Sequence, residues 1–348
     1  MKKLLILTVV FAFIVNSALF SAPELTKIGT YKCGKQPKQV LFSPDSKYIV
    51  LPLLDDNGFD IFDVSEKKML KRINPPNAAK VGFAEGLFIP EKNVFLVSQM
   101  TTANLYEYSY PDFKLLRTIP TKGVWSKFIA YSAEKNLLCV SNWVSNDVSL
   151  IDYESGNLVR KIKTAAAPRG LYFSDKGENI IVLSYEGGKI HKFSTQTGTK
   201  VSEISVPKSS MRHIVVNKDE TKAYVSDMYY FQIYEVDLAS FKITKKLKVY
   251  DNPNTIALLN DRWLFVSNRG PNNPKDYTKR SPKNGKITVI DTSDMSVVKT
   301  YPGGNQPTGL DLNAEGNILC SSNFQDQNIE LYSVTVDKEE STSSTVAK

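Results

Sequence analysis

One short pattern occurs seven times along this chain and constrains its fold more than any other feature. Each unit begins with an apolar run that ends in an anchor residue before a turn, and the anchors are Phe42, Phe88, Tyr131, Phe173, Val216, Leu258 and Leu312. A second run ends eleven residues after each anchor, or ten in the sixth unit, at Leu53, Gln99, Asn142, Ser184, Asp227, Asn268 and Asn323. Repeats of about 40–45 residues that each hold several strands are typical of β-propellers. The sequence therefore predicts an all-β fold, a seven-bladed β-propeller.

Length and composition are consistent with a single ring. The chain has 348 residues, of which 42% are hydrophobic, and all-β folds of this length often form one domain. Alternating runs such as residues 148–152 are bounded by Gly, Pro, Asn and Asp, which is the pattern of short strands. We therefore expect one propeller domain over residues 23–336. Three cysteines leave at least one free thiol, and a bridge between Cys33 and Cys320 stays open.

The two ends of the chain differ in composition from the repeats. Lys2 and Lys3 precede an apolar run over residues 4–15 and then small residues, which is the pattern of a secretory signal peptide. We expect residues 1–22 to be this peptide and the protein to be secreted across the inner membrane, to the periplasm or the cell surface. No later run is long and apolar enough to predict a transmembrane span. Residues 337–348 are charged and Ser/Thr-rich, and we expect a disordered tail.

The seventh unit predicts only three strands, because the tail follows its third apolar run. Residues 25–32 read as a strand that has no blade of its own. We expect this N-terminal strand to pair onto the last blade and complete it. Such pairing would cover an edge that could otherwise pair with another chain.

Basic residues recur at one register position. The residues four positions before the anchors are Lys38, Ala84, Lys127, Arg169, Arg212, Asn254 and Thr308, and four of the seven are cations. In a propeller this position lies where the innermost strand begins, so these side chains should surround one mouth of the central channel. A ring of cations in a concave mouth attracts anions. The alternative is a structural role, in which the arginines pair with neighbouring blades.

The loops expected at the same face carry further cations and aromatic residues. The insertion in the sixth unit, residues 269–286, includes Arg269, Lys279 and Arg280. Loops much longer than their siblings are often functional or disordered. The aromatic candidates are Trp125, Trp143, Tyr229 and Tyr230. Aromatic residues among cations are typical of single-stranded nucleic acid sites, where bases stack and phosphates pair, although packing between blades would also explain them.

The repeat also carries a family resemblance. Residues 138–152, followed by Gly156, Ile162 and the step Pro168, Arg169, Gly170, resemble the YVTN-type repeat of secreted bacterial propellers, which is related to lactonase-like propellers. The resemblance extends over residues 24–336 and implies seven blades. Members of that family include periplasmic proteins that bind single-stranded DNA, lactonases, subunits of redox enzymes and surface-layer proteins. The resemblance therefore implies no single function.

One pair of residues in this sequence is a candidate for catalysis. Arg212 followed by His213 resembles the Arg-His step of lactonase-type propellers, and Asp227 could act with His213 as an acid–base pair. The Gly-Pro and Asn-Glu pairs of that family are replaced here by Ser210-Met211 and Asp227-Met228. Only two histidines occur, so we expect no metal site and no cofactor.

These observations favour a binding module over an enzyme. The formal net charge of +8 favours acidic partners, so we expect an anionic ligand, either single-stranded nucleic acid or an acidic polymer such as an acidic glycan. A lactonase-type hydrolase is the first alternative. The second is a surface adhesin, with a host or matrix protein as partner and a broad outer face as its site. We expect a monomer.

Overall fold

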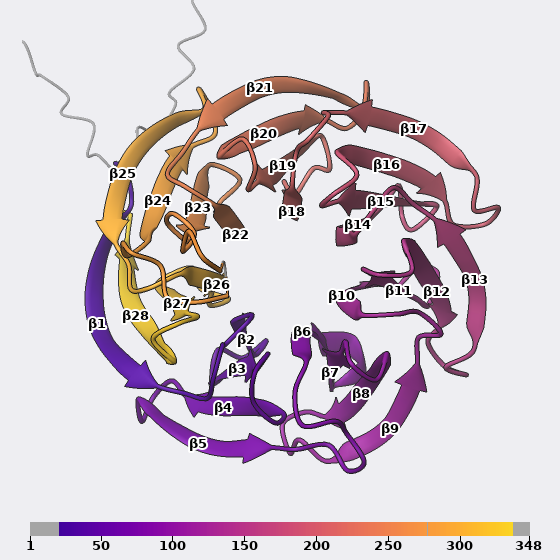
Figure 1. Ribbon diagram of the computed structural model, residues 1–348, viewed down its shortest axis with the longest axis horizontal. Helices are drawn as coiled ribbons and strands as arrows, with labels where there is room; N and C mark the ends of the chain where they lie inside the picture. Colours follow the sequence, from indigo (N-terminus) through magenta and orange to yellow (C-terminus); the bar gives the residue numbers. More distant parts are fainter. Residues whose placement is uncertain (1–20, 277, 337–348) are drawn as a thin grey trace, which may run out of the picture.

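The computed structural model describes residues 21–276 and 278–336, and the proposed signal peptide and tail lie almost wholly outside them. Seven four-stranded antiparallel sheets form a ring around a central channel (Figure 1). This confirms the seven-bladed β-propeller. In blades one to six, the first strand along the chain lies innermost and the fourth lies outermost. In blade seven, the outermost strand comes from the N-terminal end of the described chain.

The strands follow the repeat unit by unit. Blade one holds β2 (Leu41–Phe42), β3 (Tyr48–Pro52), β4 (Phe59–Asp63) and β5 (Lys68–Ile73). Blade two holds β6 (Phe83–Ile89), β7 (Val94–Gln99), β8 (Asn104–Ser109) and β9 (Leu115–Pro120), with a short 3-10 helix, η1 (Pro90–Lys92). Blade three holds β10 (Ser126–Ser132), β11 (Leu137–Asn142), β12 (Asp147–Asp152) and β13 (Leu158–Lys163). Blade four holds β14 (Pro168–Ser174), β15 (Asn179–Ser184), β16 (Lys189–Ser194) and β17 (Lys200–Ser205).

The remaining blades repeat this order. Blade five holds β18 (Met211–Val216), β19 (Lys222–Asp227), β20 (Gln232–Asp237) and β21 (Lys242–Lys248). Blade six holds β22 (Pro253–Leu259), β23 (Trp263–Asn268), β24 (Lys286–Asp291) and β25 (Ser296–Pro302). Blade seven holds β26 (Pro307–Leu312), β27 (Ile318–Asn323), β28 (Asn328–Thr335) and β1 (Glu24–Lys32).

The ring closes through the N-terminal strand, as the sequence predicts. Strand β1 pairs antiparallel with β28, from Glu24 opposite Thr335 to Lys32 opposite Asn328 (Figure 1). Leu25 of β1 is buried in the core between blades six and seven, where it lies with Val334. The first and last strands of the ring therefore form one sheet. Cys33, Cys139 and Cys320 are free thiols.

The innermost strand of six blades has a β-bulge near its start, where the strand borders the channel. In six blades the register shifts there, as between Pro168 and Leu171, where Arg169 and Gly170 lie opposite Leu183 alone. Bulges bend a strand and re-aim its side chains, often next to functional sites. The residues three and four positions before each anchor occupy these bulges, so the basic positions identified in the sequence fall on the bent part of the strand.

Serine side chains join neighbouring bulges. The hydroxyls of Ser98, Ser141, Ser226, Ser267 and Ser322 each accept a hydrogen bond from a bulge N–H of their own blade. Four of these serines, all except Ser141, also donate to a carbonyl of the next blade. Ser226, for example, accepts from His213 N at 3.1 Å and donates to Asn254 O at 2.6 Å.

The Ser226→Ala variant should lose about 1–2 kcal/mol of unfolding free energy, because two buried backbone groups lose their partner. Urea denaturation of the variant would measure this loss. Ser205, an exposed residue of the outer strand β17, is the matched control, and Ser205→Ala should stay within about 0.5 kcal/mol of wild type. Equal stability of the two variants would show that the serine contact between blades contributes nothing.

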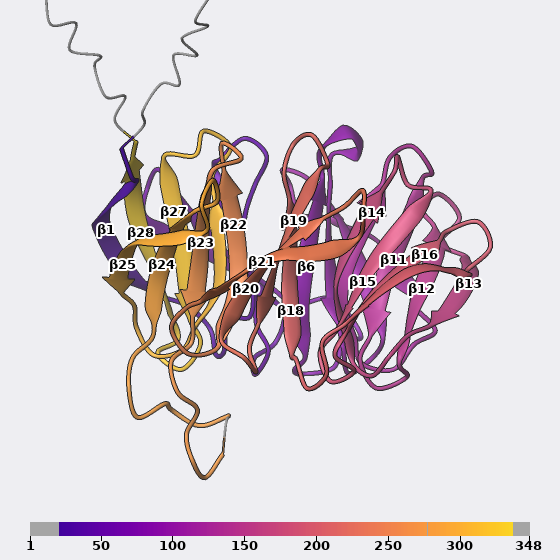
Figure 2. The ribbon, with the colours of Figure 1, turned by 90° about the horizontal axis from the view of Figure 1, so that it is seen from above.

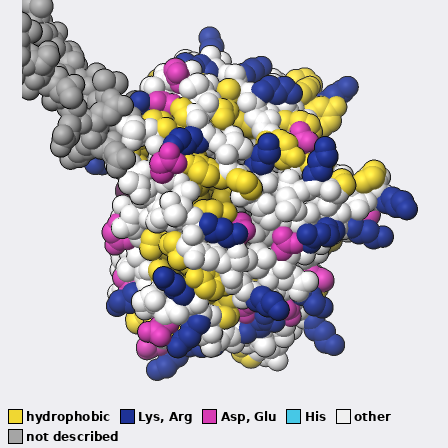
Figure 3. All heavy atoms as spheres, turned by 90° about the vertical axis from the view of Figure 1, so that its left-hand side faces the viewer, with side chains coloured by type: hydrophobic (Ala, Val, Ile, Leu, Met, Phe, Trp, Pro, Cys, Tyr) yellow, Lys and Arg dark blue, Asp and Glu magenta, His cyan; other side chains and the backbone are white. Residues whose placement is uncertain are grey.

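The insertion of the sixth unit is a projecting loop between β23 and β24. Figure 2 shows it extending beyond the other loops, and Figure 3 shows Lys and Arg side chains on the projection at its right-hand side. The base of the loop is fixed to blade seven, since Ser281 N donates to Asn305 Oδ1 at 3.0 Å and Asn305 Nδ2 donates to Ser281 O at 3.1 Å. Because β23 ends at the face where the innermost strands begin, this loop lies at the face that carries the basic positions.

Candidate functional site

Three charged side chains meet across the central channel. Glu85 comes from β6 in blade two, Arg169 from β14 in blade four and Arg212 from β18 in blade five. Glu85 Oε1 accepts a hydrogen bond from Arg212 Nη2 at 3.0 Å and another from Arg169 Nη2. Blade two borders neither of the other blades, so these ion pairs cross the channel. We call Glu85, Arg169 and Arg212 the channel plug.

The plug is buried and its charges do not balance. Each of its three residues is at most 2% exposed. One carboxylate faces two guanidinium groups, and Nη1 of Arg169 together with Nη1 and Nε of Arg212 have no hydrogen-bond partner among the described residues. Buried polar groups are normally paired, and buried charges are stable only when they are compensated. The plug therefore offers unsatisfied donors and an uncompensated positive charge.

Two lysines extend the positive charge at the mouth. Lys38 and Lys127 are half-buried. The pKa of each lysine is lowered well below its usual value, first by burial and then by the nearby Arg169 and Arg212. Burial and Arg212 also lower the pKa of Arg169 to about 9, at which value it stays protonated at neutral pH. The neighbouring arginines thus add to the effect of burial, because a like charge nearby disfavours the charged form of each lysine.

Aromatic rings lie against these cations. Lys127 Nζ lies 3.7 Å from the ring centroid of Trp143 and 5.8 Å from that of Trp125. On the other side of the mouth, Lys38 Nζ lies 5.3 Å and the Arg269 guanidinium 5.0 Å from the Phe324 ring. Cation–π contacts of this kind stabilise desolvated positive charge. We call Lys38, Lys127, Arg269, Trp143 and Phe324, together with the channel plug, the basic mouth.

Three other aromatic candidates lie at the rim. Trp125 is 44% exposed and has a φ of 58°, a left-handed conformation that recurs at the same register position in most blades, as at Ala167 and Gln306. Tyr229 is 51% exposed, and its ring centroid lies 4.9 Å from that of the half-buried Tyr230. Tyr230 also donates from its hydroxyl to Pro207 O at 3.0 Å. Trp125 and Tyr229 are therefore accessible to a ligand on this face.

The loop candidates divide into a buried and an exposed group. Arg269 is 7% exposed and donates to Gln306 Oε1. Arg280 is exposed and forms an ion pair with Asp326. Lys279 is also exposed, and its carbonyl accepts from Gln306 Nε2 at 3.3 Å. The structure therefore brings Arg269 into the basic mouth and leaves Lys279 and Arg280 on the projecting loop.

The structure does not bring His213 and Asp227 together. Asp227 Oδ1 accepts from the backbone N–H groups of Ser210 and Tyr229, at 2.8 and 2.9 Å, and Oδ2 accepts from Tyr234 Oη at 2.6 Å. Asp227 therefore holds the loop after β19 in place, and no hydrogen bond within the described chain joins it to His213. The His213 ring lies 5.5 Å from the Phe128 ring. Its pKa is lowered well below the usual value by burial, Arg212 and Arg169, so the imidazole is neutral.

The register position that identifies the cations does not identify Glu85, the acid of the channel plug. It lies one residue after Ala84, the basic ring's position in blade two, and so occupies the second bulge position. An acid next to a ring of cations is a signal present in the sequence, but only the ring geometry shows which cations it meets. Within residues 21–276 and 278–336, no three His, Cys, Asp or Glu side chains are grouped to hold a metal ion. No helix in these ranges has the length and apolar character to span a membrane.

Comparison with known proteins places the chain among its relatives. No family model matches it. Antigen Lp49 of Leptospira interrogans serogroup Icterohaemorrhagiae serovar copenhageni is 36% identical over 316 residues, which span 88% of this chain and 69% of the antigen. Identity at this level over most of both chains indicates common descent. The chain therefore belongs to the same family as Antigen Lp49.

Proposed function

We propose that this protein is a binding module that takes an anionic ligand at the basic mouth. The unpaired, buried guanidinium donors of Arg169 and Arg212 carry this proposal. An anion seated above the plug would offset, through its charge, the positive charge that Glu85 leaves uncompensated. The same anion would raise the pKa values of Lys38 and Lys127, which burial and the neighbouring cations lower in the free protein.

The aromatic residues at the rim of the basic mouth indicate which class of anion would bind. Trp125 and Tyr229 expose large rings on the face that carries the cations. Stacking on such rings adds to phosphate or carboxylate pairing for ligands that have flat or partly apolar units. Single-stranded nucleic acid combines both properties, and acidic glycans combine charge with apolar sugar faces. We propose this ligand class with Lys38, Lys127, Arg169 and Arg212 for charge and with Trp125, Trp143, Tyr229 and Tyr230 for stacking.

The N-terminal segment and Antigen Lp49 both bear on where the protein acts. We propose that the protein is secreted and acts in the periplasm or at the cell surface, since its first residues have the pattern of a signal peptide. The name of Antigen Lp49 describes a protein that the immune system meets, which is consistent with exposure outside the cell. We also propose that the repeats of this chain belong to the YVTN-type repeats of secreted bacterial propellers, which they resemble.

Tryptophan fluorescence tests the proposal, because Trp143 lies against Lys127 and Trp125 is exposed at the rim. The protein would be titrated with a short single-stranded oligonucleotide and, separately, with an acidic polysaccharide, at low and at moderate salt. We expect saturable quenching that weakens steeply as salt rises, since binding releases counterions. No change with either ligand at either salt would contradict the proposal.

A pair of double variants locates the site. Lys38→Gln with Lys127→Gln removes two cations from the mouth, and we expect the affinity to fall by at least about tenfold. Lys176→Gln with Lys218→Gln is the matched control, because it removes the same charge from turns at the opposite face. Equal losses in the two variants would indicate a general charge effect. Binding that survives both variants would favour the adhesin hypothesis, with an outer face as the site.

A further inference from the structure

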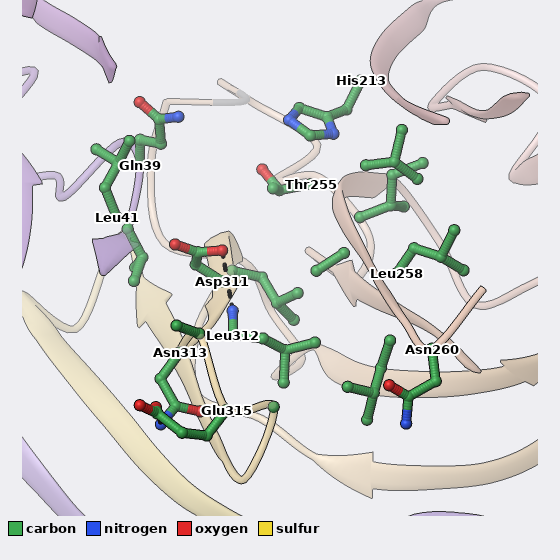
Figure 4. Close-up of a pocket in the computed structure, with 18 residues that line it drawn as sticks. Gln39, Leu41, His213, Thr255, Leu258, Asn260, Asp311, Leu312, Asn313 and Glu315 are labelled. Carbon is green, nitrogen blue, oxygen red and sulfur yellow. Dashed lines mark hydrogen bonds between the residues drawn. The ribbon is translucent and has the colours of Figure 1, made fainter. Parts of the chain in front are cut away.

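The end of the channel opposite the basic mouth contains a cavity of about 510 Å³ (Figure 4). It lies where the innermost strands β2, β22 and β26 end, and Figure 4 shows Leu41, Leu258 and Leu312 around it. Its volume falls within the range of about 300–1,000 Å³ that is typical of sites for small molecules. Its walls combine leucine side chains with polar groups of similar extent. We call this cavity the vestibule.

The charge of the vestibule is opposite to that of the mouth. Its lining includes the acids Asp311 and Glu315 but no lysine or arginine. Asp311 points into the cavity in Figure 4, and His213, Thr255 and Gln39 lie around its upper part in that view. No ion pair within the described chain involves Asp311. The channel therefore has a cationic end and, at the vestibule, an end lined by acids and by no cation.

Asp311 keeps part of its hydrogen-bonding capacity. Its Oδ2 accepts from Phe42 N at 2.8 Å and its Oδ1 from Leu312 N at 2.9 Å. Each carboxylate oxygen has two lone pairs, so each can accept one more hydrogen bond. Across the cavity, Nδ1 of His213 is buried and has no partner among the described residues. The Asp311 carboxylate can therefore serve a ligand without losing either of its two backbone hydrogen bonds.

We propose that the vestibule is a second binding site, and that its ligand is a small ammonium compound with an apolar body. The ammonium group would donate to the free lone pairs of Asp311, which has no cation of its own. The apolar body would bury the exposed faces of Leu41, Leu258 and Leu312. This site is separate from the basic mouth and does not depend on the function proposed for it.

The pH dependence of such binding has a defined sign. Burial raises the pKa of Asp311 to about 7. The other titratable groups near it are His213, whose pKa burial lowers, Cys320, whose pKa burial raises, and Glu315 at the rim. Alkylammonium groups stay charged to about pH 10, as Lys does. Ammonium binding should therefore strengthen as pH rises through 7, where Asp311 becomes ionised.

Three matched probes test the proposal by isothermal titration calorimetry: 2-phenylethylammonium, the neutral 2-phenylethanol and the anionic 3-phenylpropionate. We expect saturable binding of the ammonium compound that is about thirtyfold tighter at pH 8.5 than at pH 5.5, because Asp311 titrates within that range. The alcohol should bind more weakly and without this pH dependence. Equal affinity of the alcohol and the ammonium compound at pH 8.5 would overturn the proposal.

Variants place the binding in the cavity. Ala257 lines the vestibule, and Ala257→Phe should fill it and abolish binding while leaving Asp311 intact. Asp311→Asn should remove the pH dependence, and Lys38→Gln with Lys127→Gln, at the far mouth, should leave ammonium binding unchanged. Unchanged binding in a folded Ala257→Phe protein would overturn the assignment, as would the absence of saturable binding in the wild type.

Discussion

Replacing Glu85 by glutamine is expected to destabilise the propeller by about 3–5 kcal/mol, because removal of one partner leaves buried charges uncompensated. Glu85 accepts from both Arg169 and Arg212, and all three residues are at most 2% exposed. Glutamine preserves the size of the side chain, so the loss would come from charge and not from a cavity. Urea denaturation followed by circular dichroism measures the change.

A control and a rescue make this prediction specific. Glu66 is exposed, and within the described residues its one ion pair is with the exposed Lys68, so Glu66→Gln should change the stability by less than about 1 kcal/mol. Sulfate should stabilise the Glu85→Gln variant more than the wild type, because an anion can take the place of the missing carboxylate between the two arginines. A Glu85→Gln variant as stable as the Glu66→Gln control would show that the plug holds no uncompensated charge.

The repeat register was enough to predict the seven-bladed ring and the face at which the basic side chains lie. Seven anchors at regular spacing predict seven blades, and the unpaired strand at residues 25–32 predicts the closure that β1 and β28 form. The position four residues before each anchor also identifies the basic mouth, since every innermost strand begins at the same face. These inferences succeed because each depends on local spacing that all blades share.

Contacts across the channel could not be predicted in the same way. Arg169 and Arg212 meet Glu85 because the ring brings blades four and five opposite blade two, and sequence spacing does not give distances across a ring. The expected pair of His213 and Asp227 fails for a local reason, because backbone N–H groups of its own loop already satisfy Asp227. The position of Asp311 at the vestibule could not be predicted from the sequence, because a single aspartate in an alternating strand usually faces water.

The basic mouth also predicts that anion binding takes up protons. The pKa values of Lys38 and Lys127 are lowered in the free protein by burial and by the neighbouring cations. A bound anion would raise both pKa values, so the complex holds more protons than the free protein over the range between the free and bound values. Affinity should therefore fall as pH rises through that range, by up to about tenfold per pH unit for each lysine.

Calorimetry in two buffers of different ionisation enthalpy, with the anion found by fluorescence, counts the protons taken up. The wild type should take up protons on binding, and the control with Lys176→Gln and Lys218→Gln should behave in the same way. The variant with Lys38→Gln and Lys127→Gln should bind without proton uptake, because glutamine does not titrate. Affinity that rises with pH, or an absence of proton uptake by the wild type, would show that the ligand does not bind near these lysines. The measurement therefore distinguishes binding at the basic mouth from binding at another basic surface of the ring.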